Sequence, residues 1–83
     1  MQTTRVKVPW PDGLHLRHAS RLVKAAARFH STVRLRCGDK IADLRSIIGI
    51  IALCATIGTT LEVEVNGDDE ADAAQTVEQI FLA

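Results

Sequence analysis

Gly13, His15 and Arg17 form a short motif in which one residue separates each from the next. A neutral imidazole is nucleophilic near pH 7, because its unperturbed pKa is ~6.5, so it accepts a phosphoryl group without a separate base. A guanidinium two residues away would stabilise the negative charge that this group brings. The motif predicts His15 as a phosphoryl acceptor and Arg17 as its charge partner. A surface histidine beside a helix start is the alternative.

The motif leads directly into a helical pattern over residues 16–29. Apolar residues recur on one face of this helix and form its expected buried stripe: Ala19, Leu22, Val23, Ala26 and Phe29. His15 would then lie at a loop-to-helix junction, where free backbone N–H groups and the positive end of the helix dipole favour an anion. Gly13 would let the backbone turn tightly before the helix.

The opposite side of the same helix is basic. It carries four cationic residues at spacings of three and four: Arg17, Arg21, Lys24 and Arg28. Such a stripe is either a solvated face or a docking surface for acidic partner proteins.

Ser46 stands immediately before an apolar stretch, as the N-cap of a helix does. A phosphate on this serine would meet the N–H groups and the dipole of the short helix, so we expect it to affect docking and not folding. A helix of two turns does not bury apolar groups all round. Part of the set Ile47, Ile48 and Ile51 is therefore expected to form an exposed apolar patch.

Residues 13–20 resemble the active-site motif of HPr, the histidine-containing phosphocarrier protein of the bacterial sugar phosphotransferase system. Residues 45–53 resemble the second signature of this family, around a regulatory serine. The resemblance implies that His15 accepts a phosphoryl group from an enzyme I-like donor and passes it to a sugar-specific enzyme II-type acceptor. Because HPr proteins are substrates of enzymes, it implies no enzyme activity. We also expect no cofactor and no metal.

The resemblance also implies where partners bind. Basic residues of the first helix, here Arg21 and Lys24, would meet the partner enzymes, and the apolar patch would surround the phosphorylated histidine. Ser46 would be the substrate of a serine kinase and phosphorylase, and the modified protein would bind a transcriptional regulator. The alternative function is a regulatory interaction module that acts through Ser46 and the patch, with little or no role in sugar transport.

Four residues depart from the family pattern: Asp12, Leu16, His18 and Cys54. Asp12 adds a carboxylate that would repel an incoming phosphoryl group, Leu16 adds bulk, and His18 puts an ionisable ring in the first helical turn. A third hypothesis is a metal site formed by His15 and His18 with Asp12 or Cys54. Its support is weak because the sequence fixes no third ligand.

Composition limits the class of protein. The 83 residues make one domain, 1–83, and ten basic and ten acidic residues give no net charge, which argues against nucleic-acid and membrane-surface binding. Cys37 and Cys54 form no CxxC pair, so free thiols in a reducing cytosol are expected. The most apolar run, residues 47–57, is shorter than the ~20 residues of a membrane span, and no secretory signal opens the chain. We expect a cytoplasmic protein.

Alternation of polar and apolar residues predicts strands at 5–8, 32–37, 40–43 and 61–65, with a hairpin turn at Gly38. A final helix follows residue 67, with Asp68 or Asp69 as its cap. Its expected buried stripe is Ala73, Ala74, Val77, Ile80 and Phe81. The order βαββαβα predicts an α+β open-faced β-sandwich, in which a four-stranded antiparallel sheet carries three helices on one face.

Two further aromatic residues lack a clear chemical role in the sequence. Trp10 lies in a Pro-rich loop, where covering the edge of the core is a commoner role than contact with a partner. His30 lies beyond the basic helix and is assigned no role.

Overall fold

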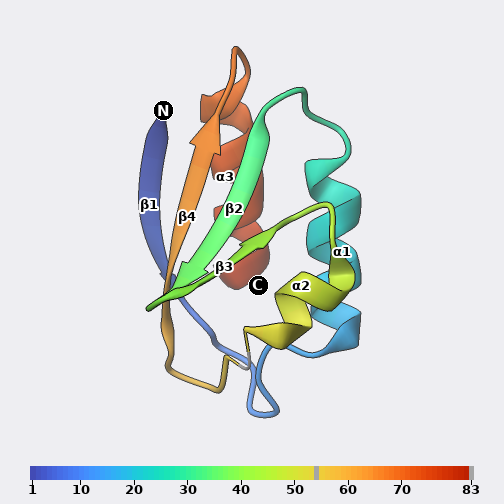
Figure 1. The fold of residues 1–83 in the computed structure, drawn as a ribbon, viewed down its shortest axis with the longest axis vertical. Helices are drawn as coiled ribbons and strands as arrows, with labels where there is room; N and C mark the ends of the chain where they lie inside the picture. Colours follow the sequence, from blue (N-terminus) through green and yellow to red (C-terminus); the bar gives the residue numbers. More distant parts are fainter. Residues whose placement is uncertain (54, 83) are drawn as a thin grey trace.

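The structure is a computed structural model that describes residues 1–53 and 55–82. Over these residues the chain forms four strands and three helices (Figure 1). In chain order they are β1 (Gln2–Lys7), α1 (Leu16–Ala26), β2 (Thr32–Cys37), β3 (Lys40–Asp43), α2 (Ile47–Ala52), β4 (Thr60–Asn66) and α3 (Glu70–Leu82). Within the described residues, every helix is too short or too polar to cross a membrane.

The strands form one antiparallel sheet in the order β1-β4-β2-β3. The hairpin predicted at Gly38 is confirmed, with Cys37 opposite Lys40 at its closed end. Strand β4 lies between β1 and β2, so Val63 is opposite both Thr4 and Leu35. The predicted open-faced α+β sandwich is confirmed.

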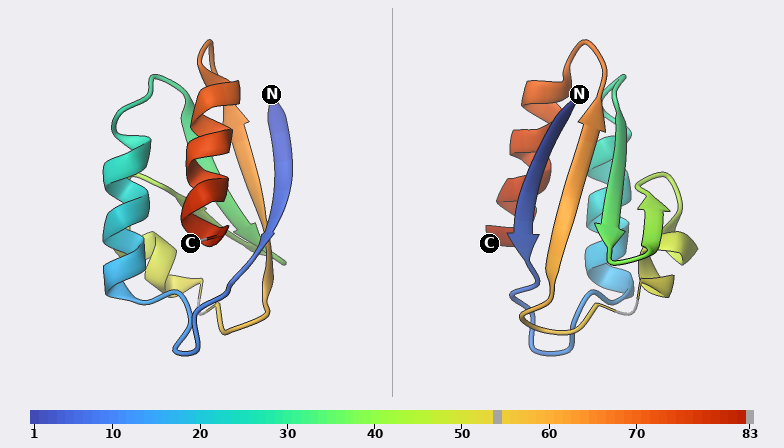
Figure 2. Two further views of the ribbon diagram at one scale, coloured as in Figure 1. Left: turned by 180° about the vertical axis from the view of Figure 1, so that it is seen from behind. Right: turned by 60° about the vertical axis from the view of Figure 1, so that its left-hand side comes forward.

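One face of the sheet carries the helices and the other is open, as the two views in Figure 2 show. In β4 the apolar residues Leu61, Val63 and Val65 are fully buried beneath the helices. Glu64 alternates with them on the open face, where its carboxylate accepts a hydrogen bond from Arg36 Nε at 2.9 Å. Period-two alternation therefore separates the apolar core from the polar face.

Helix α1 ends at Ala26, three residues before the predicted end at Phe29. Beyond it, Arg28 and Phe29 donate backbone hydrogen bonds three residues back, which is the tighter pattern of a helix terminus. Phe29 is only half-buried there, and so is Val23. The buried stripe instead includes His18 and Ala25, because α1 packs against both α2 and α3 and is covered on two flanks.

Asp69 ties the start of α3 to the loop that precedes β2. Its carboxylate accepts hydrogen bonds from the backbone N–H groups of His30 and Ser31 and from the Ser31 hydroxyl. The helix cap predicted for Asp68 or Asp69 is thus replaced by a contact with a distant loop, while the Asp69 carbonyl accepts the first helical bond from Ala73. The two segments approach closely at Gly67, where a Cβ would lie 2.7 Å from the Cα of Ser31.

We predict that Asp69→Asn lowers the midpoint of thermal unfolding at neutral pH. Hydrogen bonds from Ser31 and His30 hold the pKa of the Asp69 carboxyl below its usual range. Its stabilisation is present above the unfolded pKa of about 4 and is lost as the pH falls through the lower folded value. Thermal melts followed by circular dichroism at pH 7 and below pH 4 should show the difference between wild type and variant shrinking in acid.

Asp68→Asn is the matched control, since Asp68 is exposed and accepts no side-chain hydrogen bond from the residues described. Equal melting losses in the two variants would contradict the role given to Asp69.

Candidate functional site

His15 is the N-cap of α1, in extended backbone conformation. Its Nδ1 accepts a hydrogen bond from the backbone N–H of Arg17, the second residue of the helix, at a distance of 3.3 Å. An N-cap side chain normally satisfies one of the free amides of the first turn in this way. The predicted loop-to-helix junction is confirmed, and it places an imidazole nitrogen at the positive end of the helix dipole.

The loop before His15 is fixed at Gly13, where φ is 79° and L side chains are strained. A Cβ on Gly13 would lie 2.6 Å from the carbonyl oxygen of Ala55. The same carbonyl accepts the backbone N–H of Leu14 at 2.9 Å, and Leu14 is buried. Glycine is therefore required both for the turn and for the approach of the segment around Ala55.

The two nitrogens of His15 have different partners. Nε2 lies 3.1 Å from Oδ2 of Asp12, and the His15 side chain is 36% exposed. Because Nδ1 accepts the Arg17 amide, a neutral ring carries its proton on Nε2 and donates it to Asp12. The nucleophilic lone pair then lies on Nδ1, at the helix terminus. The carboxylate that was expected to repel a phosphoryl group lies on the Nε2 side of the ring.

Trp10 and His18 stack behind this histidine. Their ring centroids are 3.7 Å apart with the planes inclined by 10°, and Trp10 also contacts Phe81 of α3 at 5.2 Å. Trp10 is only 8% exposed, so the prediction that it covers the core is confirmed. The His15 ring lies 4.3 Å from that of His18, which places it at the end of an aromatic line that begins in the core.

The burial of His18 was not foreseen from the sequence. Its side chain is 3% exposed, and its Nδ1 has no hydrogen-bond partner among the residues described. Burial is the main cause that lowers the pKa of His18, and the nearby charges of His15 and Arg17 lower it further. The ring is therefore neutral near pH 7, so the expected unfavourable cation in the first helical turn is absent at that pH.

Ser46 is the N-cap of α2, as predicted. Its backbone is extended, and its Oγ accepts the backbone N–H of Gly49 at 3.0 Å. The residue is exposed, so its hydroxyl is open to solvent at the start of the helix.

The prediction that part of the set Ile47, Ile48 and Ile51 is exposed is confirmed. Ile48 is 82% exposed and Ile51 is also exposed, but Ile47 is half-buried and packs on the core. Leu16, in the first turn of α1, is a further exposed apolar residue. Helix α2 packs against α1 and lies beside its first turns in both Figure 1 and Figure 2. We call Leu16, Ile48 and Ile51 the apolar patch.

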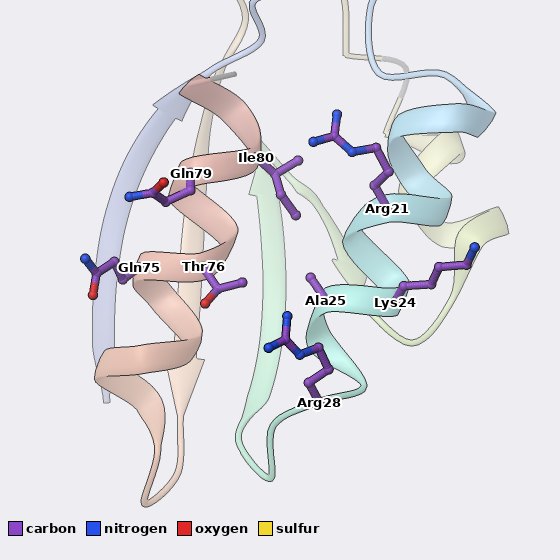
Figure 3. A pocket seen from close by; sticks show the side chains of 8 residues that line it. All are labelled: Arg21, Lys24, Ala25, Arg28, Gln75, Thr76, Gln79 and Ile80. Atoms are coloured by element: carbon purple, nitrogen blue, oxygen red, sulfur yellow. The ribbon is translucent and has the colours of Figure 1, made fainter.

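Three residues of the basic stripe of α1, Arg21, Lys24 and Arg28, line a groove of about 640 Å³ between α1 and α3. Figure 3 shows Arg21 and Arg28 reaching toward α3, whereas Lys24 points away from it. The facing wall includes Ile80, which was expected to be buried and is half-buried. Of the four basic residues, Arg17 is therefore the one beside His15, and the other three lie farther along the helix.

Two side-chain triads in the described residues have metal-ligating atoms within 4.8 Å of one another: Asp12, His15 and His18, and His30, Asp68 and Asp69. Cys54, which the sequence offered as a further ligand, lies outside the described residues. Cys37 is a half-buried free thiol, as expected.

A family model described as the PTS HPr component phosphorylation site matches residues 2–82. The phosphocarrier protein HPr of Lysinibacillus sphaericus is 36% identical over 77 residues, which cover 93% of this chain and 88% of that protein. The phosphocarrier protein HPr of Treponema pallidum is 38% identical over 81 residues, covering 98% of this chain and 92% of its own length.

Solved structures of HPr and of Crh are also similar to this chain. The crystal structure of HPr from Thermoanaerobacter tengcongensis superposes with a TM-score of 0.93 at 27% identity, covering 99% of this chain and 92% of that one. Crh, a catabolite repression protein of Bacillus subtilis that crystallised as a swapped dimer, gives a TM-score of 0.79 at 30% identity. That match covers 99% of this chain and 94% of Crh.

Proposed function

This chain belongs to the HPr family of phosphocarrier proteins, and we propose that its His15 accepts a phosphoryl group from an enzyme I-like donor. The group is then passed to a sugar-specific enzyme II-type acceptor. One observation carries the proposal: the lone pair of His15 Nδ1 lies at the N-terminus of α1, while Nε2 is held by Asp12.

In the proposed transfer, the Nδ1 lone pair forms the new bond to phosphorus. The bond between phosphorus and the donor breaks, and its electron pair stays on the donor. The Arg17 amide, which had donated to Nδ1, then donates to a phosphoryl oxygen, and the Arg17 guanidinium adds a positive charge. The reverse sequence of bond changes delivers the group to the acceptor.

Asp12 has a positioning role in this account. With phosphorus on Nδ1 and a proton on Nε2, the imidazole ring carries positive charge, which the Asp12 carboxylate 3.1 Å from Nε2 stabilises. The carrier is a substrate of both partner enzymes, and we assign it no catalytic activity of its own and no cofactor.

Partners are proposed to bind over the apolar patch and the basic residues of α1. An exposed Ile48 next to an exposed Ile51 gives the apolar centre, and Arg17 lies at the histidine. Arg21 and Lys24 would add charge complementarity to acidic partners, which raises the association rate more than the affinity.

The test of the proposal is intact mass after incubation with phosphoenolpyruvate and a bacterial enzyme I. The result expected is a gain of one acid-labile phosphoryl group per chain. If neither this enzyme I nor the enzyme I of the same organism produced a gain in mass, the phosphocarrier function would be contradicted.

Similarity to Crh favours a second candidate, a regulatory module in which a kinase modifies Ser46. Ser46 is exposed at the start of α2 and two residues from Ile48, so a phosphate there places a dianion beside the apolar patch. The patch would then bind a regulator and not the transfer enzymes. The two candidates differ in one result: in the regulatory module, His15→Ala leaves binding of the regulator intact.

Substitutions at Ser46 separate its structural role from its docking role. Ser46→Ala should lower the free energy of unfolding by about 1 kcal/mol, because the Gly49 amide loses its cap. Ser46→Asp keeps an acceptor at the cap and should retain the fold while slowing phosphoryl uptake from enzyme I. Chemical denaturation and a timed uptake assay give the two quantities, and unchanged uptake in Ser46→Asp would contradict the docking role.

A further inference from the structure

The cluster formed by Asp12, His15 and His18 has the composition of a transition-metal site. Two imidazoles and a carboxylate are ligands that zinc accepts, with a water in the fourth position. All three residues present a ligating atom within 4.8 Å of the other two. The sequence left the third ligand open, and the structure places Asp12 there.

The spacing of the first two ligand atoms fits zinc closely. His15 Nε2 and Asp12 Oδ2 are 3.1 Å apart. Two ligand atoms at the usual zinc bond lengths are separated by about 3.3–3.5 Å in a tetrahedral site. An ion could therefore replace the proton that Nε2 and Oδ2 share with little movement of either side chain.

The buried ring of His18 is the independent sign of a ligand. Its side chain is almost wholly buried, with 3% exposed, and Nδ1 has no partner in the described part of the chain. Buried polar atoms normally have a partner, so each exception calls for a physical explanation. The ligating nitrogen of His18 lies within 4.8 Å of the ligating atoms of the other two residues, so the ring must move toward the ion to complete the site.

We propose that Asp12, His15 and His18 bind one Zn²⁺ ion per chain, and that the bound ion prevents phosphorylation of His15. The binding is independent of the proposed function, whereas its effect on phosphorylation rests on that function. The ion is a regulator and not a requirement for transfer.

The local charges define where the ion lies. The helix terminus and Arg17 disfavour a cation on the Nδ1 side of His15, where the Arg17 amide points. On the Nε2 side, the Asp12 carboxylate provides the compensating negative charge. The proposed position is therefore on the Nε2 side.

The second triad, His30, Asp68 and Asp69, is a poorer metal site. The Asp69 carboxylate already accepts hydrogen bonds from His30 and Ser31, and both oxygens are occupied. A metal between His30, Asp68 and Asp69 would compete with the contact that joins α3 to the loop before β2. His30 consequently offers a matched control for His15 and His18.

Inhibition follows from the single proton of a neutral imidazole. In the free protein this proton is on Nε2 and the lone pair is on Nδ1. Zinc binds through the Nε2 lone pair, so the proton that leaves Nε2 is taken up at Nδ1. Nδ1 then has no lone pair with which to form a bond to phosphorus, and the hydrogen bond from the Arg17 amide is lost.

Binding is tested on the full chain by titration with Zn²⁺ against a chromophoric chelator. We expect one ion per chain, a loss of affinity of at least tenfold in Asp12→Asn and in His18→Gln, and no change in His30→Ala. Asp12 is 73% exposed, so Asp12→Asn tests the site even where His18→Gln fails to fold. Absence of binding at micromolar zinc, or undiminished binding in Asp12→Asn, would overturn the proposal.

The regulatory effect is tested by phosphoryl uptake from enzyme I with zinc and with excess chelator. Wild type should be inhibited over the zinc range of the binding curve and restored by the chelator, while Asp12→Asn should resist zinc relative to its own zinc-free rate. Equal inhibition of both proteins would show that zinc acts on the donor enzyme, and it would refute the proposed effect of zinc on His15. Zinc binding without uptake under any condition would refute the phosphocarrier function and leave the metal site standing.

Discussion

Replacement of His15 by alanine is expected to abolish phosphoryl uptake from enzyme I. The variant lacks the nucleophilic nitrogen, and the neighbouring His18 does not replace it because its ring is almost wholly buried. Loss of the N-cap acceptor should cost only about 1 kcal/mol of stability, so the protein remains folded for the assay. Intact mass before and after incubation with phosphoenolpyruvate and enzyme I measures the effect.

His30→Ala is the matched control, because His30 is an exposed histidine whose contact with Asp69 uses its backbone N–H. The control should take up one phosphoryl group as wild type does. Uptake that persisted in His15→Ala, or that vanished equally in His30→Ala, would assign the phosphoryl acceptor to a different residue.

The largest effect on stability is expected for Trp10→Ala. Trp10 is almost wholly buried and fills the space between His18 of α1 and Phe81 of α3. Truncation of a buried aromatic side chain to alanine typically costs about 3–5 kcal/mol, part of which comes from the cavity left behind. In a domain of this size the midpoint of thermal unfolding should fall by roughly 12–40 °C, as measured by circular dichroism.

Trp10→Phe is the control that separates packing from identity. It keeps an aromatic ring against His18 and should lose less than half as much stability as Trp10→Ala. A midpoint in Trp10→Ala within 2–3 °C of wild type, which corresponds to less than about 1 kcal/mol, would contradict the packing role.

The strands were the most predictable part of the fold. Residues 61–65 alternate without interruption, and the structure buries Leu61, Val63 and Val65 on one face as that pattern requires. The β2–β3 hairpin was equally local, since Gly38 supplies its turn. The end of α1 was missed because Phe29 is apolar and continues the helical pattern. The backbone hydrogen bonds of Arg28 and Phe29 already run three residues back, as at a helix terminus.

The same distinction between local and long-range contacts applies to the functional site. His15 and Ser46 are N-caps, and a cap is a contact between residues two or three apart, so the sequence predicts it well. The burial of His18 depends on Trp10 and on Phe81 near the other end of the chain, and no local pattern encodes it. Asp69 was assigned to a cap for the same reason, since its partner Ser31 is 38 residues away.

We propose Nδ1 of His15 as the atom that carries the phosphoryl group. Long-range ¹H–¹⁵N correlation NMR of the protein phosphorylated by enzyme I identifies the substituted nitrogen of each histidine ring. We expect a phosphorus-coupled Nδ1 and a protonated Nε2 on His15, with the rings of His18 and His30 unmodified. Phosphorus on Nε2 of His15, or on either of the other two histidines, would contradict the proposal.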